Sequence, residues 1–404
     1  MKKILIITMS LLLVLEIITV SSCASTPSEE QEVTSPQKEE VAQPEEEETV
    51  TSEGEQVVVE EEDIATPEKE AAVTEENKIV TPAEEETETE EDETPSTPMP
   101  RGNADPDIQI DIYDSNKAYT GTTLLTDIHN TEKPRIIEVN MLGKVVWEYL
   151  VPQDLKRYTG GGFDVEWLEN DNILFVLPRK GVYEINRSGE IVWSYLTNKI
   201  SHDADRLPNG NTIFVWGFPD KMEDAQVTEI TPEGKIVWAW YAKDHLDKST
   251  YNDIYQDGWT HTNAVTRLAN GNTLISPRNF QFVILVDPQG SIIKTIGEGK
   301  VYDPHDPEVL TNGNILVASL NQPPRAVEID SRDRIVWEFR TLGHGIWHVR
   351  DTDRLPNGNT LLCGTTQIVE ITTSGEIVWQ LSLKNMTEDE RPTVNGFFKA
   401  ERVR

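Results

Sequence analysis

An all-β fold, a six-bladed β-propeller, is predicted for the last three quarters of this 404-residue chain. Three observations predict it. A unit of about 45 residues occurs six times, as blade repeats do. Each unit carries tight-turn signals and short apolar runs without a helical period. The opening strand that the first unit lacks is found at the C-terminal end of the chain.

The clearest mark of the repeat is a glycine, a variable residue, and then Val or Ile, Val and Trp. Four copies are complete, at Gly143–Trp147, Gly189–Trp193, Gly234–Trp238 and Gly375–Trp379. Two are degenerate, at Gly290–Lys294 and Asp333–Trp337. These segments are predicted to be the last strand of each blade, and their Trp and Val side chains are predicted to pack between blades.

A second mark, Leu-x-Asn-Gly-Asn, precedes the glycine mark. Its copies begin at Leu207, Leu268, Leu310 and Leu355, with a weaker one at Leu168. Asn-Gly is favoured in tight hairpin turns because both residues tolerate positive φ. A polar, Asp-rich run precedes each turn and an apolar run follows it, so each turn is predicted to join the first two strands of a blade.

The first repeat begins directly at its second strand, Thr122–Leu125. The missing first strand is matched by Lys399–Val403, whose pattern follows Asp203–Leu207. We therefore expect the C-terminal strand to complete blade one. Such a closure leaves the ring of blades without an unpaired edge at that point.

Residues 1–22 are predicted to be a signal peptide. Lys2 and Lys3 precede a short apolar run, and small residues lead into Cys23. The run contains Glu16 and is too short for a membrane span. It resembles the lipobox of bacterial lipoproteins, which predicts lipidation of Cys23, an exported cell-envelope lipoprotein and a membrane contact through that anchor. An ordinary signal peptide with an incidental cysteine is the alternative.

Residues 23–100 are predicted to be a disordered acidic tether, and residues 101–404 the propeller. Between 24 and 100 there are 27 acidic residues against 3 lysines. Such a segment cannot bury enough apolar surface to offset the entropy of ordering. Nucleic acid is excluded as a partner because no part of the chain is basic. The lone Cys363 of the folded part forms no internal disulfide and is expected to be buried.

Four histidines share a register on the predicted first strands. His202 and His305 lie five residues before the leucine of the turn, and His261 and His348 lie seven before it. An offset of two keeps side chains on one strand face, so all four are expected at one mouth of the channel. Phe163 and Phe398 occupy the five-before position in the other two blades.

Three interpretations of the histidines remain open at this point. They can satisfy polar groups at strand ends, bind a metal with Asp203 and Asp306, or bind and transform an anion. No local metal-ligand spacing is present. We therefore predict no metal site and no cofactor.

Several of these segments resemble the bacterial arylsulfate sulfotransferases, over roughly residues 115–404. The similar segments are Trp259–Asn263 followed by Ser276–Arg278, His202–Asp203 leading into the Leu207 turn, and His305 before Asn314–Val317. The resemblance implies a six-bladed propeller that moves a sulfuryl group from a phenolic sulfate ester to a phenol. No nucleotide donor is used, and a sulfated histidine is the intermediate.

The resemblance implies that His305 is the nucleophile, and that His202, His261 and Arg278 hold the sulfate and assist proton transfer. A neutral imidazole is a competent nucleophile, a second imidazole can exchange protons with the phenol, and a guanidinium can hold two sulfate oxygens. Phe163, Phe398 and Trp259 are candidates for stacking on phenol rings, and they are equally compatible with packing. His348 is included as a fourth substrate contact, although it has no counterpart among the family's functional residues.

The chain also departs from the family pattern. It lacks the family's N-terminal β-domain and paired cysteines, and Ala318–Gln322 replaces an Asp-Asn-Gly stretch. A non-catalytic surface propeller that binds an anionic ligand or a partner protein is the alternative function. A relative of the quinoprotein propellers or a propeller hydrolase is a third, although quinoproteins usually have more blades. Nothing in the sequence indicates an oligomer, so we expect a monomer.

Overall fold

The computed structural model describes residues 102–246, 249–252, 257–321, 323–384 and 395–403. The chain divides into two units, Met1–Thr89 and Glu90–Arg404, and every described residue belongs to the second. The predicted signal peptide, the lipidation of Cys23 and the acidic tether lie outside the described residues. Within these ranges, no helix has the length and apolar character needed to cross a membrane.

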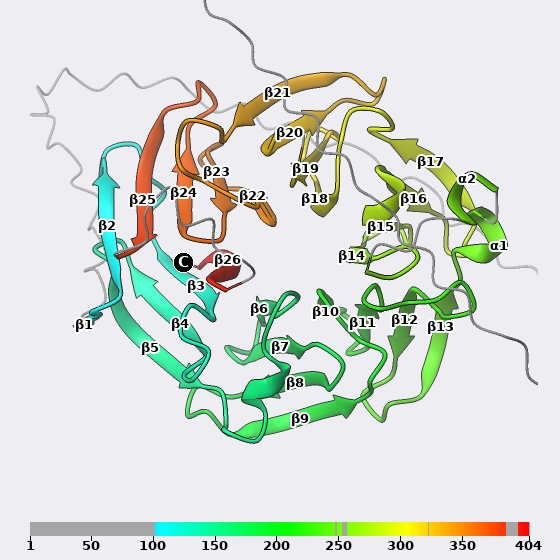
Figure 1. The fold of residues 1–404 in the computed structure, drawn as a ribbon, viewed down its shortest axis with the longest axis horizontal. Helices are drawn as coiled ribbons and strands as arrows, with labels where there is room; N and C mark the ends of the chain where they lie inside the picture. The colour runs from blue at the N-terminus through cyan, green and yellow to red at the C-terminus, as the bar shows by residue number, and fades with distance from the viewer. Residues whose placement is uncertain (1–101, 247–248, 253–256, 322, 385–394, 404) are drawn as a thin grey trace, which may run out of the picture. The chain divides into compact units, whose positions relative to one another are not determined.

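The described strands form six antiparallel sheets arranged around a central channel as the blades of a propeller (Figure 1). This confirms the predicted fold. From the channel outward, blade 1 holds β26 (Phe397–Val403), β3 (Thr122–Asp127), β4 (Arg135–Asn140), β5 (Lys144–Leu150) and β1 (Asn103–Ala104). Blade 2 holds β6 (Val165–Trp167), β7 (Ile173–Leu177), β8 (Gly181–Ile185) and β9 (Ile191–Leu196). Blade 3 holds β10 (Ala204–Arg206), β11 (Thr212–Val215), β12 (Val227–Ile230) and β13 (Ile236–Trp240).

The other three blades follow the same order. Blade 4 holds β14 (Thr262–Arg267), β15 (Thr273–Pro277), β16 (Val283–Val286) and β17 (Ile292–Ile296). Blade 5 holds β18 (Pro304–Val309), β19 (Ile315–Ser319), β20 (Arg325–Ile329) and β21 (Ile335–Arg340). Blade 6 holds β22 (Asp351–Arg354), β23 (Thr360–Cys363), β24 (Gln367–Ile371), β25 (Ile377–Leu383) and β2 (Ile108–Tyr113).

The ring closes as the sequence predicts, with the C-terminal strand β26 innermost in blade 1. It pairs antiparallel with β3, and Ala400 lies opposite Leu125. Because strands from both ends of the chain share one sheet, blade 1 cannot separate from blade 6 without breaking these backbone hydrogen bonds.

A second closure was not predicted. Strands β1 and β2 pair with the outer edges of two neighbouring blades, so blades 1 and 6 have five strands instead of four. Asn103 lies opposite Val145 in blade 1, and Ile108 lies opposite Leu383 in blade 6. Ile108 is only 3% exposed, so this segment adds apolar burial as well as backbone pairing to the joint.

The tryptophans of the repeat hold adjacent blades together, as predicted. The same prediction was wrong for Val192, Val237 and Val336, which are exposed because the outermost strand of a blade presents one face to solvent. The Trp147 indole nitrogen of blade 1 donates to the Arg187 carbonyl oxygen of blade 2 at 2.8 Å. Trp379 of blade 6 donates in the same way to Met141 of blade 1 at 3.0 Å. Each such bond satisfies a buried or half-buried indole N–H, which is costly to leave without a partner.

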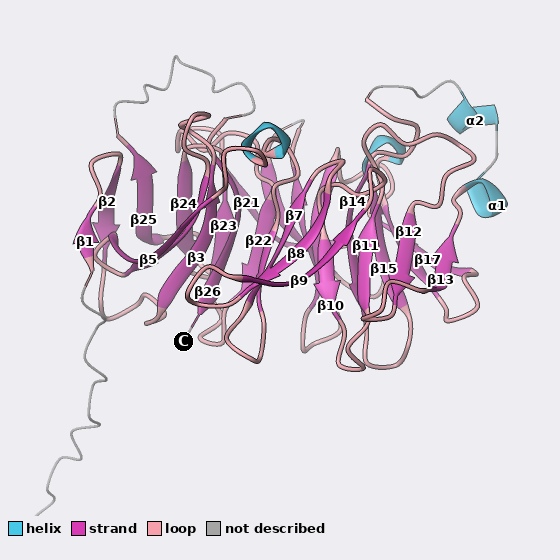
Figure 2. Cartoon of the chain, turned by 90° about the horizontal axis from the view of Figure 1, so that it is seen from below, coloured by secondary structure: helices cyan, strands magenta, loops and turns pink. Residues whose placement is uncertain are grey.

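Short helical turns occur only in the connections of the described chain, and they lie at one face of the ring (Figure 2). They are η1 (Lys156–Tyr158), α1 (Lys243–Leu246), α2 (Ser249–Asn252) and η2 (Arg278–Phe280). The first residues of the inner strands reach the channel at this face, which places the candidate site there.

Candidate active site

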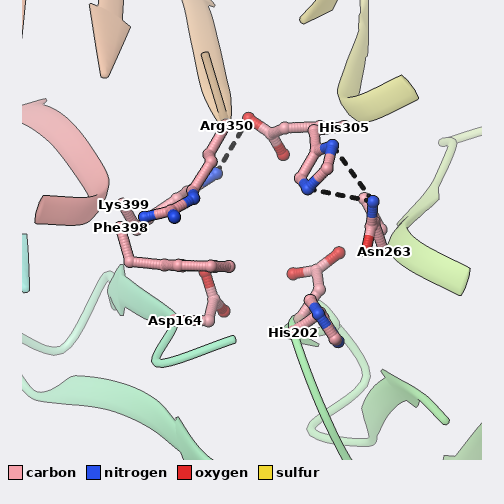
Figure 3. A pocket seen from close by; sticks show the side chains of 10 residues that line it. Asp164, His202, Asn263, His305, Arg350, Phe398 and Lys399 are labelled. Atoms are coloured by element: carbon pink, nitrogen blue, oxygen red, sulfur yellow. Dashed lines mark hydrogen bonds and ion pairs between the residues drawn. The ribbon is translucent and has the colours of Figure 1, made fainter. Parts of the chain in front are cut away.

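Three of the four predicted histidines come together at the start of neighbouring inner strands. The Nε2 atoms of His202 and His261 lie 3.3 Å apart, and their ring centroids are 4.9 Å apart. His202 and His305 both line one narrow cavity at the centre of the ring, together with Asn263, whose amide nitrogen contacts the His305 ring (Figure 3). The structure therefore brings together side chains from blades 3, 4 and 5.

Two of these histidines are held in an unusual backbone conformation. His202 has φ 64° and His261 has φ 47°, in the left-handed region that residues other than glycine rarely adopt. Neighbouring loops pack closely against the backbone at or next to both histidines. A Cβ at Gly162 would lie 2.7 Å from the His202 amide nitrogen, and one at Gly217 would lie 2.1 Å from the Thr262 carbonyl oxygen. Such strain persists only where the surrounding structure enforces it, and it is concentrated at functional sites.

The hydrogen bonds of His305 define its tautomer. Its Nδ1 lies 2.9 Å from the Asp303 carbonyl oxygen, which can only accept, so Nδ1 carries the hydrogen. The lone pair is then on Nε2. The Asn263 amide nitrogen lies 3.0 Å from Nε2 and 3.1 Å from Nδ1, so it is not directed along that lone pair. Asn263 also donates to the Pro304 carbonyl oxygen at 3.1 Å. The imidazole is thus held with its unprotonated nitrogen available for attack on an electrophile.

A buried carboxylate outside the predicted set of site residues positions His261. Asp220, on the loop between β11 and β12, accepts the backbone N–H of His261 at 3.1 Å. It also accepts the backbone N–H and the hydroxyl of Thr260, at 3.1 and 2.8 Å. Burial raises the pKa of Asp220, although these donors oppose the shift. No local sequence signal marks this residue, because its partners lie about 40 positions later.

Arg278 approaches the histidines from the loop after β15. Its Nη1 lies 3.1 Å from Nε2 and 3.2 Å from Nδ1 of His261. Its Nε faces the Asp303 carboxylate at 3.8 Å. Gln281 fixes that carboxylate by donating to it at 2.9 Å. The guanidinium therefore has one distant carboxylate and keeps donor capacity for another anion.

Burial and positive neighbours keep two of the imidazoles neutral. Burial lowers the pKa of His305 well below its usual value, and the charge of Arg278 lowers it further. Burial also lowers the pKa of His202, with the neighbouring His261 as the next cause. Both rings are therefore uncharged at neutral pH, which is the form that acts as a nucleophile or a base.

Across the cavity from His305 and Asn263 stand Arg350 and Phe398 (Figure 3). The Arg350 guanidinium lies over the Phe398 ring, 5.1 Å from its centroid. Phe398 was predicted at this place, whereas Arg350 was not. The sequence could have indicated Arg350, because it lies five residues before Leu355. His202 and His305 occupy the same position relative to the turn leucine of their blades.

Three other predicted site residues lie away from the cavity lining. Trp259 and Phe163 are fully buried, and each packs edge to face against a phenylalanine of its own blade. Neither therefore presents a ring face to a phenol. His348 has φ 51° and precedes the start of β22, and its Nδ1 lies 3.4 Å from the Thr365 hydroxyl oxygen. Substrate binding by Trp259, Phe163 and His348 stays a prediction, and the burial of the first two rings favours a packing role for them.

Carboxylates also line the channel. Asp164, Asp203 and Asp306 line the same cavity as His202 and His305, and the cavities next to it are lined by Glu166, Asp205, Glu308, Asp353 and Glu401. The Lys399 ammonium lies among them and donates to Asp306 and Asp351 at 2.9 Å each. An anion is attracted to the guanidinium groups and repelled by the carboxylates, so the electrostatic potential becomes more negative along the channel, away from the arginines.

Within the described residues, one group of acidic side chains is close enough to share a metal ion. It consists of Asp306, Asp351 and Asp353, whose oxygens lie within 4.8 Å of one another. No histidine belongs to it, and Lys399 already contributes a positive charge to two of its members. This group therefore borders the histidine cluster through Asp306, which lines the same cavity as His305, and it includes no imidazole ligand.

A family model described as arylsulfotransferase (ASST) matches residues 107–312. The chain belongs to the arylsulfotransferase family. The matched range includes His202, His261, Arg278 and His305, which are the residues that the sequence resemblance singled out. Membership supports a sulfotransferase activity in general, with phenols and aryl sulfates as the substrates that the family suggests.

Among curated proteins, none matches the chain. Solved structures that are similar to this chain include a protein of unknown function from Bacteroides caccae. It is 20% identical, with 69% of this chain and 98% of that chain covered and a TM-score of 0.49. Another is virginiamycin B lyase from Staphylococcus aureus, 14% identical, with 70% of this chain and 89% of that chain covered and a TM-score of 0.44.

Proposed function

We propose that this chain is an aryl sulfotransferase that forms a sulfo-histidine on His305 and needs no nucleotide sulfate donor. The observation that carries the proposal is the tautomer of His305. Its Nδ1–H is bound to the Asp303 carbonyl oxygen at 2.9 Å, its Nε2 has the lone pair, and its ring is neutral. Beside it lie a second and a third imidazole and two guanidinium groups.

In the first step, Nε2 of His305 attacks the sulfur of an aryl sulfate. The N–S bond forms as the S–O bond to the phenol breaks, and the bonding pair leaves with the phenolate oxygen. The positive charge gained by the imidazole is stabilised by the Nδ1–H bond to the Asp303 carbonyl oxygen. Arg278 binds sulfuryl oxygens, whose charge a guanidinium can accept through two donors.

Proton transfer is assigned to His202 and His261. Their Nε2 atoms lie 3.3 Å apart, so one carries a hydrogen and the other accepts it. This hydrogen passes to the departing phenolate. In the second step the vacant nitrogen takes the proton of the acceptor phenol, whose oxygen attacks the sulfur and releases Nε2 of His305. The two steps restore every group to its starting state.

The aryl ring is assigned to the mouth of the site, beside Phe218. This half-buried side chain lies on the loop that contains Asp220, and its ring centroid is 5.6 Å from that of His261. The Arg179 guanidinium lies 5.8 Å from the Phe218 ring. A phenol ring placed here would stack on Phe218 with its oxygen directed at the imidazole pair. Phe218 replaces Trp259 and Phe163 as the candidate stacking residue.

A phenol-dependent release assay tests the proposal. The purified full chain is mixed with 4-nitrophenyl sulfate, with and without phenol and without any nucleotide, and release of nitrophenolate is followed. We expect sustained release that requires phenol, and we expect His305→Ala to abolish it. His344→Ala is the matched control, since His344 is exposed and packs on Phe339 outside the cavity.

The alternative, a propeller that binds an anion without transforming it, gives a different outcome. A folded wild-type protein that binds sulfate but releases no nitrophenolate from several aryl sulfates would support the binding propeller. Equal release by the wild type and His305→Ala would assign the activity to another nucleophile.

We also propose that residues 1–22 direct export, that Cys23 is lipidated, and that residues 23–100 are a tether to the membrane. The small residues before Cys23 and the acidic composition that follows support this. Labelling of cells with a fatty acid is expected to mark the wild-type chain and leave Cys23→Ser unlabelled. Labelling of both chains would contradict the assignment to Cys23.

A further inference from the structure

The guanidinium of Arg350 is a cation at the cavity that has no carboxylate partner among the described residues. No carboxylate oxygen of those residues lies within 4.0 Å of it, in contrast to Arg354 four positions later, which pairs with Glu328 at 2.9 Å. The Nη1 of Arg350 donates a hydrogen bond to the carbonyl oxygen of Phe397, at 3.1 Å. A guanidinium has five donors, so most of them are available to a ligand.

The position of Arg350 directs these donors at the reacting group. The side chain lines the cavity on the side opposite His305, and the Phe398 ring supports it from one face (Figure 3). A sulfuryl group bound to Nε2 of His305 projects into the space between the imidazole and this guanidinium. Arg278 contacts His261, and its charge acts on both His305 and Arg350. Two guanidinium groups from different blades therefore place their positive charge near His305.

Electrostatics agrees with this placement. Burial lowers the pKa of Arg350 to about 10, so it remains charged at neutral pH while lacking a compensating anion. An enclosed charge without a partner is costly, and an arriving anion would relieve that cost. The same charge contributes to the lowered pKa of both His305 and His202.

We infer that Arg350 is a second anion clamp, which binds the sulfuryl oxygens of the ester and of sulfo-His305 together with Arg278. The claim that Arg350 binds sulfo-His305 rests on the proposed function, because that species forms only if the transfer reaction takes place. The binding part requires no transfer reaction: the cavity holds a tetrahedral oxyanion between Arg350 and the imidazoles whether or not the sulfuryl group moves.

Binding of inorganic sulfate to the purified full chain tests the clamp, by calorimetry. Arg350→Gln removes the charge, Arg350→Lys keeps it, and Arg354→Gln is the matched control in the same blade. Loss of one charge-assisted contact predicts a dissociation constant about 10-fold higher or more for Arg350→Gln. A smaller rise is expected for Arg350→Lys and almost none for Arg354→Gln. Wild-type affinity in a folded Arg350→Gln would overturn the inference.

A kinetic measurement separates the clamp from a merely structural role. Removing the positive charge raises the pKa of His305 toward its usual value, so the acid limb of the kcat/KM profile moves to higher pH in Arg350→Gln and stays in place in Arg350→Lys. If the wild type binds sulfate but transfers none, the proposed function fails and the clamp stands. If transfer proceeds and Arg350→Gln matches the wild type in sulfate affinity and pH profile, the clamp fails and the proposed function stands.

Discussion

The imidazole Nε2 atoms of His202 and His261 lie 3.3 Å apart, although the two residues are 59 positions apart in the sequence and belong to different blades. At that distance they share one hydrogen. The Nδ1 atom of His202 is buried and has no hydrogen-bond partner among the described residues. The pair is therefore arranged to pass a single proton, and it has no carboxylate to stabilise a charged state on the His202 side.

The loss of activity in His261→Asn should depend on the pKa of the leaving phenol. If the imidazole pair protonates the departing phenolate, His261→Asn lowers kcat/KM by about 100-fold or more for esters of weakly acidic phenols. The loss should be much smaller with 4-nitrophenyl sulfate, because nitrophenolate needs little protonation. The measurement is the slope of log kcat/KM against leaving-group pKa. An equal loss for all esters would contradict proton transfer by this pair.

His348→Asn serves as the matched control for that series. Its ring lies outside the cavity lining and contacts Thr365, so we expect kcat/KM within about 3-fold of the wild type with every ester. A loss comparable to that of His261→Asn would restore His348 to the site and contradict its placement outside the cavity.

Asp220→Asn should disturb His261 without touching the substrate. The amide cannot accept all of the N–H and O–H donors that converge on the carboxylate, so the Thr260–His261 backbone loses its anchor. We expect stability to fall by about 1–3 kcal/mol and kcat to fall about 10-fold or more. Denaturant unfolding and steady-state kinetics measure the two effects. Glu223→Gln, an exposed change on the same loop, should alter neither.

The acidic layer of the channel should make stability depend on pH. Burial and the neighbouring Glu401 and Asp164 raise the pKa of Glu166 to about 8. The folded state then holds this proton more tightly than the unfolded chain. Its stabilising contribution is complete below the usual glutamate pKa and is lost as the pH rises through about 8. The unfolding midpoint should therefore fall between about pH 5 and about pH 8, and less steeply in Glu166→Gln.

Exposed Glu169 provides the control for that titration, since Glu169→Gln changes the same charge in the same blade without burial. Its pH profile should follow the wild type. Identical slopes for Glu166→Gln and Glu169→Gln would show that the proton is not held at Glu166.

The N-terminal strand β2 should stabilise the closure of the ring. Ile108 is 3% exposed and Ile112, on the same strand, is 37% exposed. Ile108→Ala is expected to cost about 2–4 kcal/mol of unfolding free energy because it leaves a cavity between β2 and β25. Ile112→Ala should cost less than about 1 kcal/mol. Equal costs would mean that this strand does not contribute to the core.

The repeat architecture could be predicted from the sequence because every blade carries a copy of the same sequence pattern. Six copies of the glycine mark gave the number of blades, and Lys399–Val403 gave the closure. Strands β1 and β2 were missed because they lie outside the repeat. Each pairs with the outer edge of a blade that already has its four strands. Their pairing is decided by edges formed far away in the sequence.

Site residues on the inner strands could be predicted from the strand register, whereas site residues on loops could not. The register placed His202, His305 and Phe398 correctly, and it also contained Arg350, which a search for histidines alone passed over. His348, which shares its register position with His261, contacts Thr365 and is not among the residues that line the cavity. Asp220 and Phe218 come from a loop that carries no repeat signal, so only the three-dimensional structure brings them to His261.

Trapping of the sulfated enzyme tests the central claim most directly. The full chain is incubated with 4-nitrophenyl sulfate in the absence of an acceptor, quenched in alkali, digested and analysed by mass spectrometry. The account predicts one stoichiometric burst of nitrophenolate and a peptide heavier by one sulfuryl group, with the modification on His305 and absent from His305→Ala. A burst with the modification on another residue, or phenol-dependent turnover with no trapped species, would contradict the assignment of His305 as the nucleophile.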